Sequence, residues 1–391
     1  MVSPGYSVHD ERFIKAISGM SGMDYHEGNR IEILDQGHET FQTLFQMIQS
    51  AKKNINIEMY LVDDDKIGME FATLLAEKAK QGVRVNFIID YIGGWKIGRN
   101  FTRLLRNSGV RLYYYNPLNL FNIFNVHNRT HKKIIVVDGT IGMLGGFGIS
   151  DPWHEDGTDP EKIKDLQVKI EGPLVHQMQS IFEVNWKEVS GESLEKSEYF
   201  PDFLSPGNLK GQIVHSVPES GKGVIHQMFL FAIKSAQNYL YIENAYFVPD
   251  AYTLKSLKET ARRGVDVRIL VPSPGKTDVS ATAYAARNFY KELIRSGIKI
   301  YEYEKQILHS KFMVIDDRWV SLGSANMDIR SMMKSQEANL NVLDRQFALN
   351  LKKIFQKDIK DSRRITLEEY KKRSILSRIN QLFVNLVESQ L

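Results

Sequence analysis

The frame His-x-Lys-x-x-x-x-Asp occurs twice in this sequence, as HKKIIVVD at residues 131–138 and as HSKFMVID at residues 309–316. The two copies lie 178 residues apart (309 − 131). A chain of 391 residues exceeds the roughly 250 to 300 residues at which a single core usually stops growing, so two domains are expected. The repeated frame predicts that these domains are two copies of one design.

Three further pairs of segments repeat at nearly the same spacing. Residues 51–65 match 236–250, residues 77–90 match 259–272, and residues 104–115 match 292–303. In each half they predict a strand, a helix ending at a glycine (Gly82 or Gly264), a strand, a helix and a strand, followed by the His-Lys strand. This alternation predicts an α/β fold in which helices pack on a sheet.

The repeat also sets the expected boundaries. We predict an N-terminal segment at 1–28, a first lobe at 29–195, a linker at 196–210, a second lobe at 211–361 and a basic amphipathic tail at 362–391. The linker is expected because residues 192–211 are rich in Ser, Pro and Gly. Apolar residues of the tail, from Ile375 to Leu391, fall at helical spacing, which favours packing on the protein itself over a membrane interface.

The first half carries ten extra residues (188 − 178) between Gly109 and His131, compared with the stretch from Gly297 to His309. Connections normally favour polar residues. This one is instead rich in large apolar residues, namely Leu118, Leu120, Phe121, Ile123, Phe124 and Val126. Either the insertion is tucked onto the core, or it forms an apolar lip near His131 that touches lipid or substrate.

Composition excludes several classes of site. The chain contains no cysteine, so a disulfide framework, a Cys-ligated zinc and a thiol nucleophile are ruled out. The net charge of +4 is compatible with an anionic partner without requiring one. No apolar run of about 20 residues and no signal peptide is found, so the chain as given is not expected to span a membrane.

Within each frame, residues two apart in a strand share a face, so His131 projects with Lys133 and His309 with Lys311. Asp138 and Asp316 stand an odd number of positions beyond the histidines and face away from them. We therefore interpret these aspartates as structural residues or as supports of the catalytic groups, and include them in the predicted catalytic set on that basis. Pairing of the lobes would bring two His and two Lys into one cationic pocket, which suits a phosphate diester.

This set of residues can perform covalent catalysis on phosphorus. One neutral imidazole attacks the diester and forms a phosphohistidine, which divides a hard step into two easier ones. The other imidazole protonates the leaving alkoxide and then deprotonates the incoming hydroxyl. The lysines neutralise charge on the non-bridging oxygens. The prediction includes no cofactor and no metal.

These motifs resemble the phospholipase D superfamily, whose members carry two H-x-K-x4-D motifs, each followed by a Gly-Ser or Gly-Gly pair. The second copy continues with Gly323-Ser324-Ala325-Asn326, and the first with Gly145-Gly146-Phe147-Gly148, where Gly148 stands in place of the family's Asn. The resemblance implies two similar lobes, each a mixed β-sheet flanked by helices, related by a pseudo-twofold axis with the active site between them. It also implies that Ser324, Asn326, Gly146 and Gly148 bind substrate.

More narrowly, the chain resembles the bacterial cardiolipin synthase group over about residues 30 to 380, in segments such as DLQVKIEGP (165–173), NMDIRS (326–331) and QEANLNV (336–342). The resemblance implies that Asp165 and Glu337 orient the catalytic histidines. It also implies that His131 is the nucleophile and His309 the acid and base. An anionic phospholipid is then the expected substrate. The expected location is the surface of the bacterial inner membrane, through peripheral contact or an upstream anchor absent from this chain, and otherwise the cytoplasm.

Other signals have simpler explanations. His127 and His131 are four apart, but the following residues predict a strand, and no carboxylate spacing supports a metal site. Glu58 and Glu243 recur in matched strands, as structural positions of a duplicated fold would. The tyrosines of the predicted strands, Tyr113, Tyr114, Tyr115, Tyr301 and Tyr303, fit half-buried sheet positions better than a platform for bases.

Four functions remain open at this stage. The first is a phosphatidyltransferase that passes a phosphatidyl group to the hydroxyl of phosphatidylglycerol. The second is a phospholipase D that passes it to water, giving phosphatidic acid. The third is a nucleic-acid phosphodiesterase on the same fold, which the modest charge and the apolar insertion disfavour, so no nucleic-acid partner is expected. The fourth is an inactive member, to which Gly148 lends some weight.

Overall fold

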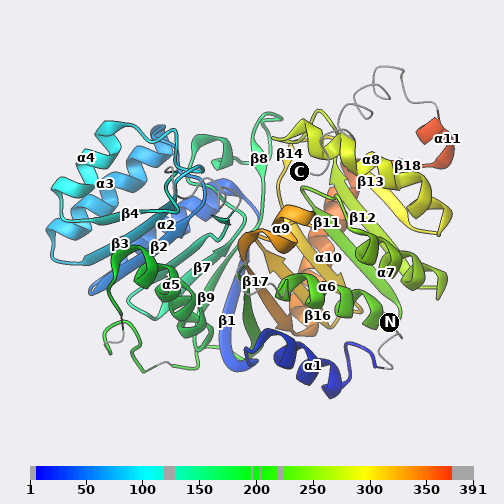
Figure 1. The fold of residues 1–391 in the computed structure, drawn as a ribbon, viewed down its shortest axis with the longest axis horizontal. Coiled ribbons are helices and arrows are strands. Elements are labelled where there is room, and N and C mark those ends of the chain that lie inside the picture. The colour runs from blue at the N-terminus through cyan, green and yellow to red at the C-terminus, as the bar shows by residue number, and fades with distance from the viewer. Residues whose placement is uncertain (1–5, 119–127, 195–196, 203, 218–222, 372–391) are drawn as a thin grey trace.

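The computed structural model describes residues 6–118, 128–194, 197–202, 204–217 and 223–371. Two lobes lie side by side, and one sixteen-stranded sheet runs through both of them (Figure 1). The lobes are joined where β1 (His26–Leu34) of the first pairs antiparallel with β10 (Leu209–Ser216) of the second. The prediction of an α/β fold with two similar lobes is confirmed.

The two halves of the sheet have the same strand order and directions. In the first lobe these are β2 (Asn54–Met59), β3 (Arg84–Asp90) and β4 (Arg111–Tyr115), which are parallel, followed by β6 (Ile134–Val137), β7 (Ile141–Gly145) and β9 (Gln167–Glu171), which are antiparallel. Their counterparts are β11 (Tyr239–Asn244), β12 (Asp266–Pro272), β13 (Lys299–Tyr303), β15 (Lys311–Ile315), β16 (Trp319–Gly323) and β17 (Ser335–Leu343).

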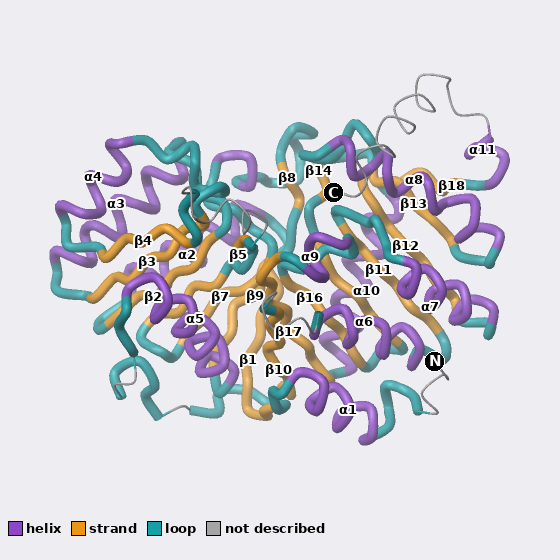
Figure 2. The backbone as a smooth tube through the Cα atoms, in the orientation of Figure 1, coloured by secondary structure: helices purple, strands orange, loops and turns teal. Residues whose placement is uncertain are grey.

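Helices cover both faces of the sheet (Figure 2). In each lobe three helices pack on one face of its sheet: α2 (Gly37–Ser50), α3 (Lys66–Lys80) and α4 (Arg99–Asn107) in the first, and α6 (Val224–Ser235), α7 (Ala251–Arg262) and α8 (Ser280–Arg295) in the second. The opposite face of each lobe carries one long helix, α5 (Leu174–Ser190) in the first and α10 (Arg345–Lys360) in the second, and apolar residues of these two helices share one core with strands of both lobes. This shared core packs the lobes against each other.

The duplicated sequence signals appear as duplicated local structure. Asp65 and Asp250 accept the N–H of the residue three positions on, at 3.0 and 2.8 Å, and so cap the start of α3 and α7. Gly82 and Gly264 follow the two helices with φ of 91° and 94°, a left-handed conformation that favours glycine. The predicted glycines at these helix ends are therefore in place.

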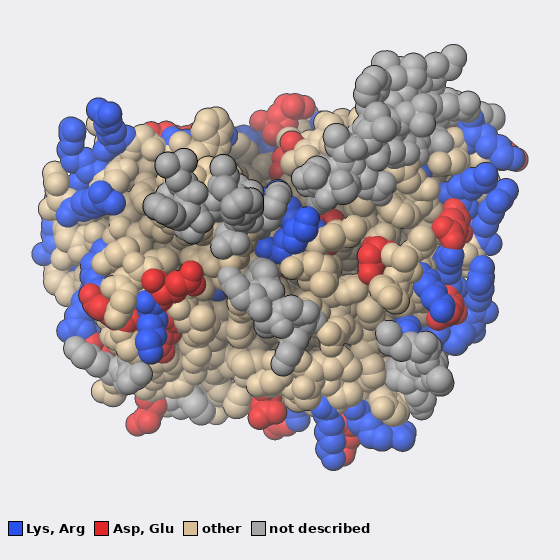
Figure 3. Space-filling view, in the orientation of Figure 1, with Lys and Arg blue, Asp and Glu red and all other residues tan. Residues whose placement is uncertain are grey.

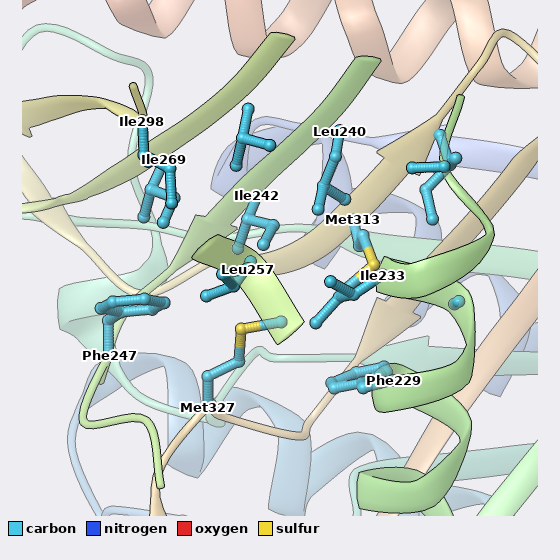
Figure 4. Close-up of a cluster of buried hydrophobic side chains, with 14 of the residues drawn as sticks. Phe229, Ile233, Leu240, Ile242, Phe247, Leu257, Ile269, Ile298, Met313 and Met327 are labelled. Carbon is cyan, nitrogen blue, oxygen red and sulfur yellow. The ribbon is translucent and has the colours of Figure 1, made fainter. Parts of the chain in front are cut away.

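The core of the second lobe includes part of the segment that leads into the site. Leu240, Ile242 and Ile269 from the strands meet Phe229 and Ile233 from α6 in a cluster of buried side chains (Figure 4). Further members of the same cluster are Phe247, Leu257, Ile298, Met313 and Met327. Since Met327 directly follows Asn326, packing of this core fixes the chain at the edge of the pocket.

The predicted lobe boundaries stay predictions, but the segments on either side of the two predicted lobes have defined packing partners. Helix α1 (Glu11–Ser21) lies in the N-terminal segment, and its Phe13 and Ile17 are buried in the core of the second lobe. At the other end, β18 (Ser362–Ile365) pairs antiparallel with β13 and extends the sheet, and a short helix, α11 (Leu367–Lys371), follows. Residues 119–127 of the apolar insertion and 372–391 of the amphipathic tail lie outside the described residues.

Two short strands cross from one lobe to the other. β5 (Arg129–Thr130), just before His131, pairs parallel with β17 of the second lobe. β14 (Ile307–Leu308), just before His309, pairs parallel with β8 (Ile163–Lys164) of the first lobe (Figure 1). The same exchange thus occurs twice, and each places a histidine at the interface between the lobes.

Candidate active site

A pocket of about 160 Å³ lies at the interface between the lobes. Basic side chains are visible near the centre of the face shown in Figure 3, where the lobes meet. The pocket is lined by polar and aromatic residues of both lobes, among them His131, Lys133, Gly148, His309 and Asn326. The structure therefore brings the two repeated frames together, as their spacing and duplication predicted.

His131 is held by an acid from the opposite lobe. Its Nδ1 lies 3.0 Å from Oε2 of Glu337, on β17. With the proton on Nδ1 and donated to Glu337, the Nε2 lone pair is left for chemistry. Burial, together with the charges of Lys133 and Lys311, lowers the pKa of His131 to about 4 despite the opposing effect of Glu337. The imidazole is therefore neutral at physiological pH, as a nucleophile must be.

His309 has the reciprocal arrangement. Its Nδ1 lies 2.5 Å from Oδ2 of Asp165, which comes from the first lobe. Burial disfavours the carboxylate, but Lys311 and His309 outweigh that effect and lower the pKa of Asp165. The rings of Trp153 and Tyr246 pack edge-on against His309, with centroids 5.5 and 5.9 Å away. Asp165 and these two rings fix the orientation of the imidazole.

The two lysines lie deep in the site on the same face as their histidines. Lys133 Nζ donates to the carbonyl oxygen of His131 at 2.8 Å, and Lys311 Nζ donates to the carbonyl oxygen of His309. Burial, with the nearby charge of Lys311, lowers the pKa of Lys133 to about 7. Burial also lowers the pKa of Lys311. Both ammonium groups would gain from an anion in the pocket, because it offsets their desolvation.

The two orienting acids have different neighbours. Glu337 accepts hydrogen bonds from the hydroxyls of Ser324 and Ser331, both at 2.5 Å. Asp165 instead accepts a hydrogen bond from Trp153 Nε1 at 3.4 Å. It also packs against Gly146, where a β-carbon would collide with the Asp165 carboxylate. Ser324 and Gly146 thus contact the orienting acids and do not line the pocket, which differs from their predicted contact with substrate.

At the last position of each motif, Asn326 and Gly148 both line the pocket. A β-carbon at Gly148 would lie 3.0 Å from Leu61 and 3.1 Å from Trp153, so these apolar side chains occupy the space beside the glycine. The wall from the first lobe is apolar at this point, whereas that from the second presents an amide.

The frame aspartates do not line the pocket, so of the two roles predicted for them the structural one fits, and they are not members of the catalytic set. Asp138 accepts the backbone N–H groups of Lys52, Lys53 and Asn54 at 2.7 to 2.9 Å, at the start of β2. Asp316 accepts three equivalent N–H groups at the start of β11, and both aspartates have a φ of 51°. Each therefore ties a strand start to a β-turn, at the end of the His-Lys strand remote from the pocket.

Several pocket residues were missed by sequence reasoning. The Tyr60 ring lies 4.8 Å from the ring of His131. Tyr246 OH donates to Asp278 Oδ2 at 2.6 Å, and burial raises the pKa of Tyr246. Burial and the charge of Glu337 raise the pKa of Asp328 to about 7. Tyr60 and Tyr246 lie just beyond the ends of the matched strands β2 and β11, so the rule that ligands bind beyond the carboxyl ends of parallel strands was a usable signal for them.

The residues that had simpler explanations lie away from the pocket. Glu58 is buried, and its Oε1 lies 3.2 Å from Lys132 Nζ. Glu243 is also buried and accepts a hydrogen bond from the hydroxyl of Ser310. Burial raises the pKa of Glu243 to about 8. Tyr113 packs edge-on against a buried tryptophan of α5, consistent with a structural role. His127 lies outside the described residues.

Comparisons with known proteins agree with this geometry. A family model described as "Cardiolipin synthase, PLD-like domain" matches residues 44–186 and 229–359. A cardiolipin synthase of Geobacillus sp. (strain WCH70) is 36% identical over 350 residues, covering 89% of this chain and 69% of that protein. Cardiolipin synthase 2 of Bacillus anthracis is 33% identical over 375 residues, covering 95% and 72%.

Among solved structures, the phosphatidylserine synthase of Haemophilus influenzae Rd KW20 superimposes with a TM-score of 0.70 over 97% of both chains, at 16% identity. At that identity the likeness concerns the fold alone. The family match covers both lobes and both histidine motifs, and the sequence relatives cover most of the chain. The chain therefore belongs to the cardiolipin synthase family of phospholipase D-like enzymes.

Proposed function

We propose that this enzyme transfers a phosphatidyl group from one anionic phospholipid to the hydroxyl of phosphatidylglycerol, through a phosphohistidine at His131. The observation that carries the proposal is the pair of histidines at the pocket, each held through Nδ1 by an acid of the other lobe at 3.0 and 2.5 Å. The family of the chain supports phospholipid substrates.

In the first step Nε2 of His131 attacks phosphorus, and the bond from phosphorus to the leaving alkoxide breaks. His309 gives a proton to that alkoxide. In the second step His309 takes the proton of the incoming hydroxyl, whose oxygen bonds to phosphorus as the phosphorus–nitrogen bond breaks. Lys133 and Lys311 stabilise negative charge on the non-bridging oxygens throughout. The low pKa of His131 supports its role as the nucleophile, since the ring does not need to lose a proton first.

We further propose that the mouth of the pocket contacts a bilayer. Exposed Val279 lines the pocket, and exposed Ile329 and Met333 line an apolar hollow that shares Asp328 with it. Trp95, 75% exposed, follows β3 next to the segment that packs on Tyr60. Apolar residues gathered at a site mouth suit an enzyme that draws its substrate from a membrane. No helix in the described parts of the chain has the length and hydropathy needed to cross a bilayer.

The proposal is tested by incubating the protein with phosphatidylglycerol vesicles and identifying the lipids by mass spectrometry. We expect cardiolipin and glycerol from the wild type, and a loss of about 10²–10⁴-fold or more in His131→Ala and His309→Ala. His26→Ala is the matched control, because His26 is exposed at the start of β1. Phosphatidic acid as the sole product would make the enzyme a hydrolase. Equal activity in wild type and both variants would refute the assignment.

A further inference from the structure

Arg129 is a buried cation of the pocket that the proposed mechanism does not use. It lies on β5, two residues before His131, lines the same pocket and is 1% exposed. Arg129, His131 and Lys133 alternate along one extended segment, so the three side chains share a face. The corresponding position of the second lobe, 178 residues on, is Ile307. The cation is thus present on one side of the site.

The guanidinium of Arg129 keeps its hydrogen-bonding capacity unused. Nε, Nη1 and Nη2 are buried, and none donates a hydrogen bond to any residue that the structure describes. The nearest carboxylate oxygen, Oδ1 of Asp90, is 3.6 Å from Nη1. Asp90 already accepts the backbone N–H groups of Ile92, Gly93 and Thr130 at 2.9 to 3.1 Å. Asp90 therefore offsets part of the charge but does not satisfy the donors.

A buried charge with unmet donors is costly unless a ligand completes it. An arginine has five N–H donors in a planar fork that matches two oxygens of a phosphate. The fork is therefore suited to an anion such as a phosphodiester.

The reacting phosphate already has its own cations. Lys133 and Arg129 stand on opposite sides of His131, and two residues of extended chain span roughly 6–7 Å. An anion at Arg129 is thus separate from the phosphorus held between the histidines and lysines. In the proposed reaction, the acceptor lipid carries a second phosphodiester, one glycerol unit away from the hydroxyl that attacks.

We infer that Arg129 binds the phosphodiester of the acceptor phospholipid and so directs the intermediate toward an anionic lipid alcohol rather than water. This inference rests on the proposed transfer reaction. Arg129 touches neither the bond that forms nor the bond that breaks. It acts as a specificity residue for the second half of the reaction.

The test uses one activated donor, a p-nitrophenyl phosphatidyl ester with deuterated acyl chains, and three acceptors: phosphatidylglycerol, glycerol and water. Only products that carry the deuterated chains are counted, because unlabelled phosphatidylglycerol is itself a donor in the proposed reaction. The measured quantity is the ratio of cardiolipin to the phosphatidylglycerol formed from glycerol. We expect Arg129→Met to lower this ratio about tenfold or more, because only the anionic acceptor loses a charge-assisted contact. Arg129→Lys keeps the charge without the fork and should fall in between.

Asp90→Asn is the matched control, since it removes the ion pair and leaves the guanidinium in place. We expect its ratio to stay at or above that of the wild type. An unchanged ratio in both Arg129 variants would overturn the inference. An equal fall in Asp90→Asn would also overturn it, because it would show that the Arg129–Asp90 ion pair has a structural role. If Arg129→Met does not fold, Arg129→Lys alone decides. A wild type that forms phosphatidic acid but no cardiolipin would instead refute the proposed transfer.

Discussion

The two lobes share their strands, strand order and helix caps, yet they differ in the residues around the two histidines. The first lobe contributes Asp165, Gly148 and Arg129, and the second contributes Glu337, Asn326 and Ile307 at the matched positions. The repeated positions build the sheet and bring the histidines together. The residues that differ between the two copies give the two histidines different surroundings. We therefore expect these differing residues to decide which histidine is the nucleophile and which is the acid.

The largest expected effect separates the two histidines directly. With the p-nitrophenyl donor the leaving group needs no proton, so His309→Ala should still form the phosphatidyl adduct but fail to activate the acceptor. Intact-protein mass spectrometry should then show one added phosphatidyl group, located by peptide mapping at His131. His131→Ala should show none. An adduct on His309 in that variant would reverse the assigned roles.

The orienting acids should give the next largest effect. Glu337→Gln and Asp165→Asn each remove the carboxylate that holds one histidine tautomer, and about 10²–10⁴-fold loss of kcat is expected on natural lipids. With the p-nitrophenyl donor, the first step should recover in Asp165→Asn, which impairs the acid, but not in Glu337→Gln, which impairs the nucleophile. Stopped-flow release of p-nitrophenolate measures this step. Equal recovery in both variants would contradict the separation of roles.

The pH dependence should sharpen the same comparison, with about a tenfold loss per pH unit on each side. Below about pH 4 His131 gains a proton and loses its lone pair, so kcat/KM should fall. Above about pH 7 Lys133 loses its proton and the charge it offers to phosphate, so kcat/KM should fall again. Lys133→Arg stays charged and should move the alkaline limb upward. An alkaline limb that does not move would assign it to another group.

The smallest expected effect asks which lobe makes the bilayer contact. Trp95→Ser on the first lobe and Ile329→Ser on the second should each weaken binding to phosphatidylglycerol vesicles by a few-fold to about tenfold, as expected for one partly buried apolar side chain. Val184→Ser is the control, because Val184 is exposed on α5 and lines neither the pocket nor the apolar hollow beside it. Vesicle co-sedimentation measures the change. Equal weakening in the control would remove the case for a defined contact surface.

Much of this arrangement was predictable from the sequence, because the duplicated segments can be recognised by their matching residues and their nearly constant spacing. The matched strands and the glycines after the helices gave the α/β lobes, and the two frames gave the histidines and lysines. The aspartates were included in the catalytic set because they close the frame in sequence, although three backbone N–H bonds hold each one at the far end of its strand. Ser324 and Gly146 were misplaced because their contact with the acids depends on tertiary packing.

The exchange of acids between lobes was beyond sequence reasoning, because it depends on how the lobes dock. Arg129 could have been found, since the alternation of Arg129, His131 and Lys133 is visible in RTHKK. What the sequence does not reveal is that its donors are unmet, because that depends on Asp90 being occupied by backbone groups. Side chains that share one face of a strand can be predicted from the sequence, whereas contacts between distant segments cannot.

The reciprocal holding of each histidine by the opposite lobe also bears on the origin of the protein. A lone ancestral lobe could complete neither histidine, whereas two identical lobes related by a twofold axis would complete both at once. Such an ancestor would have been an obligate homodimer with two equivalent histidines. Joining the copies in one chain released each from the need to match the other, and an arginine on one side and an asparagine on the other became possible without changing their partners.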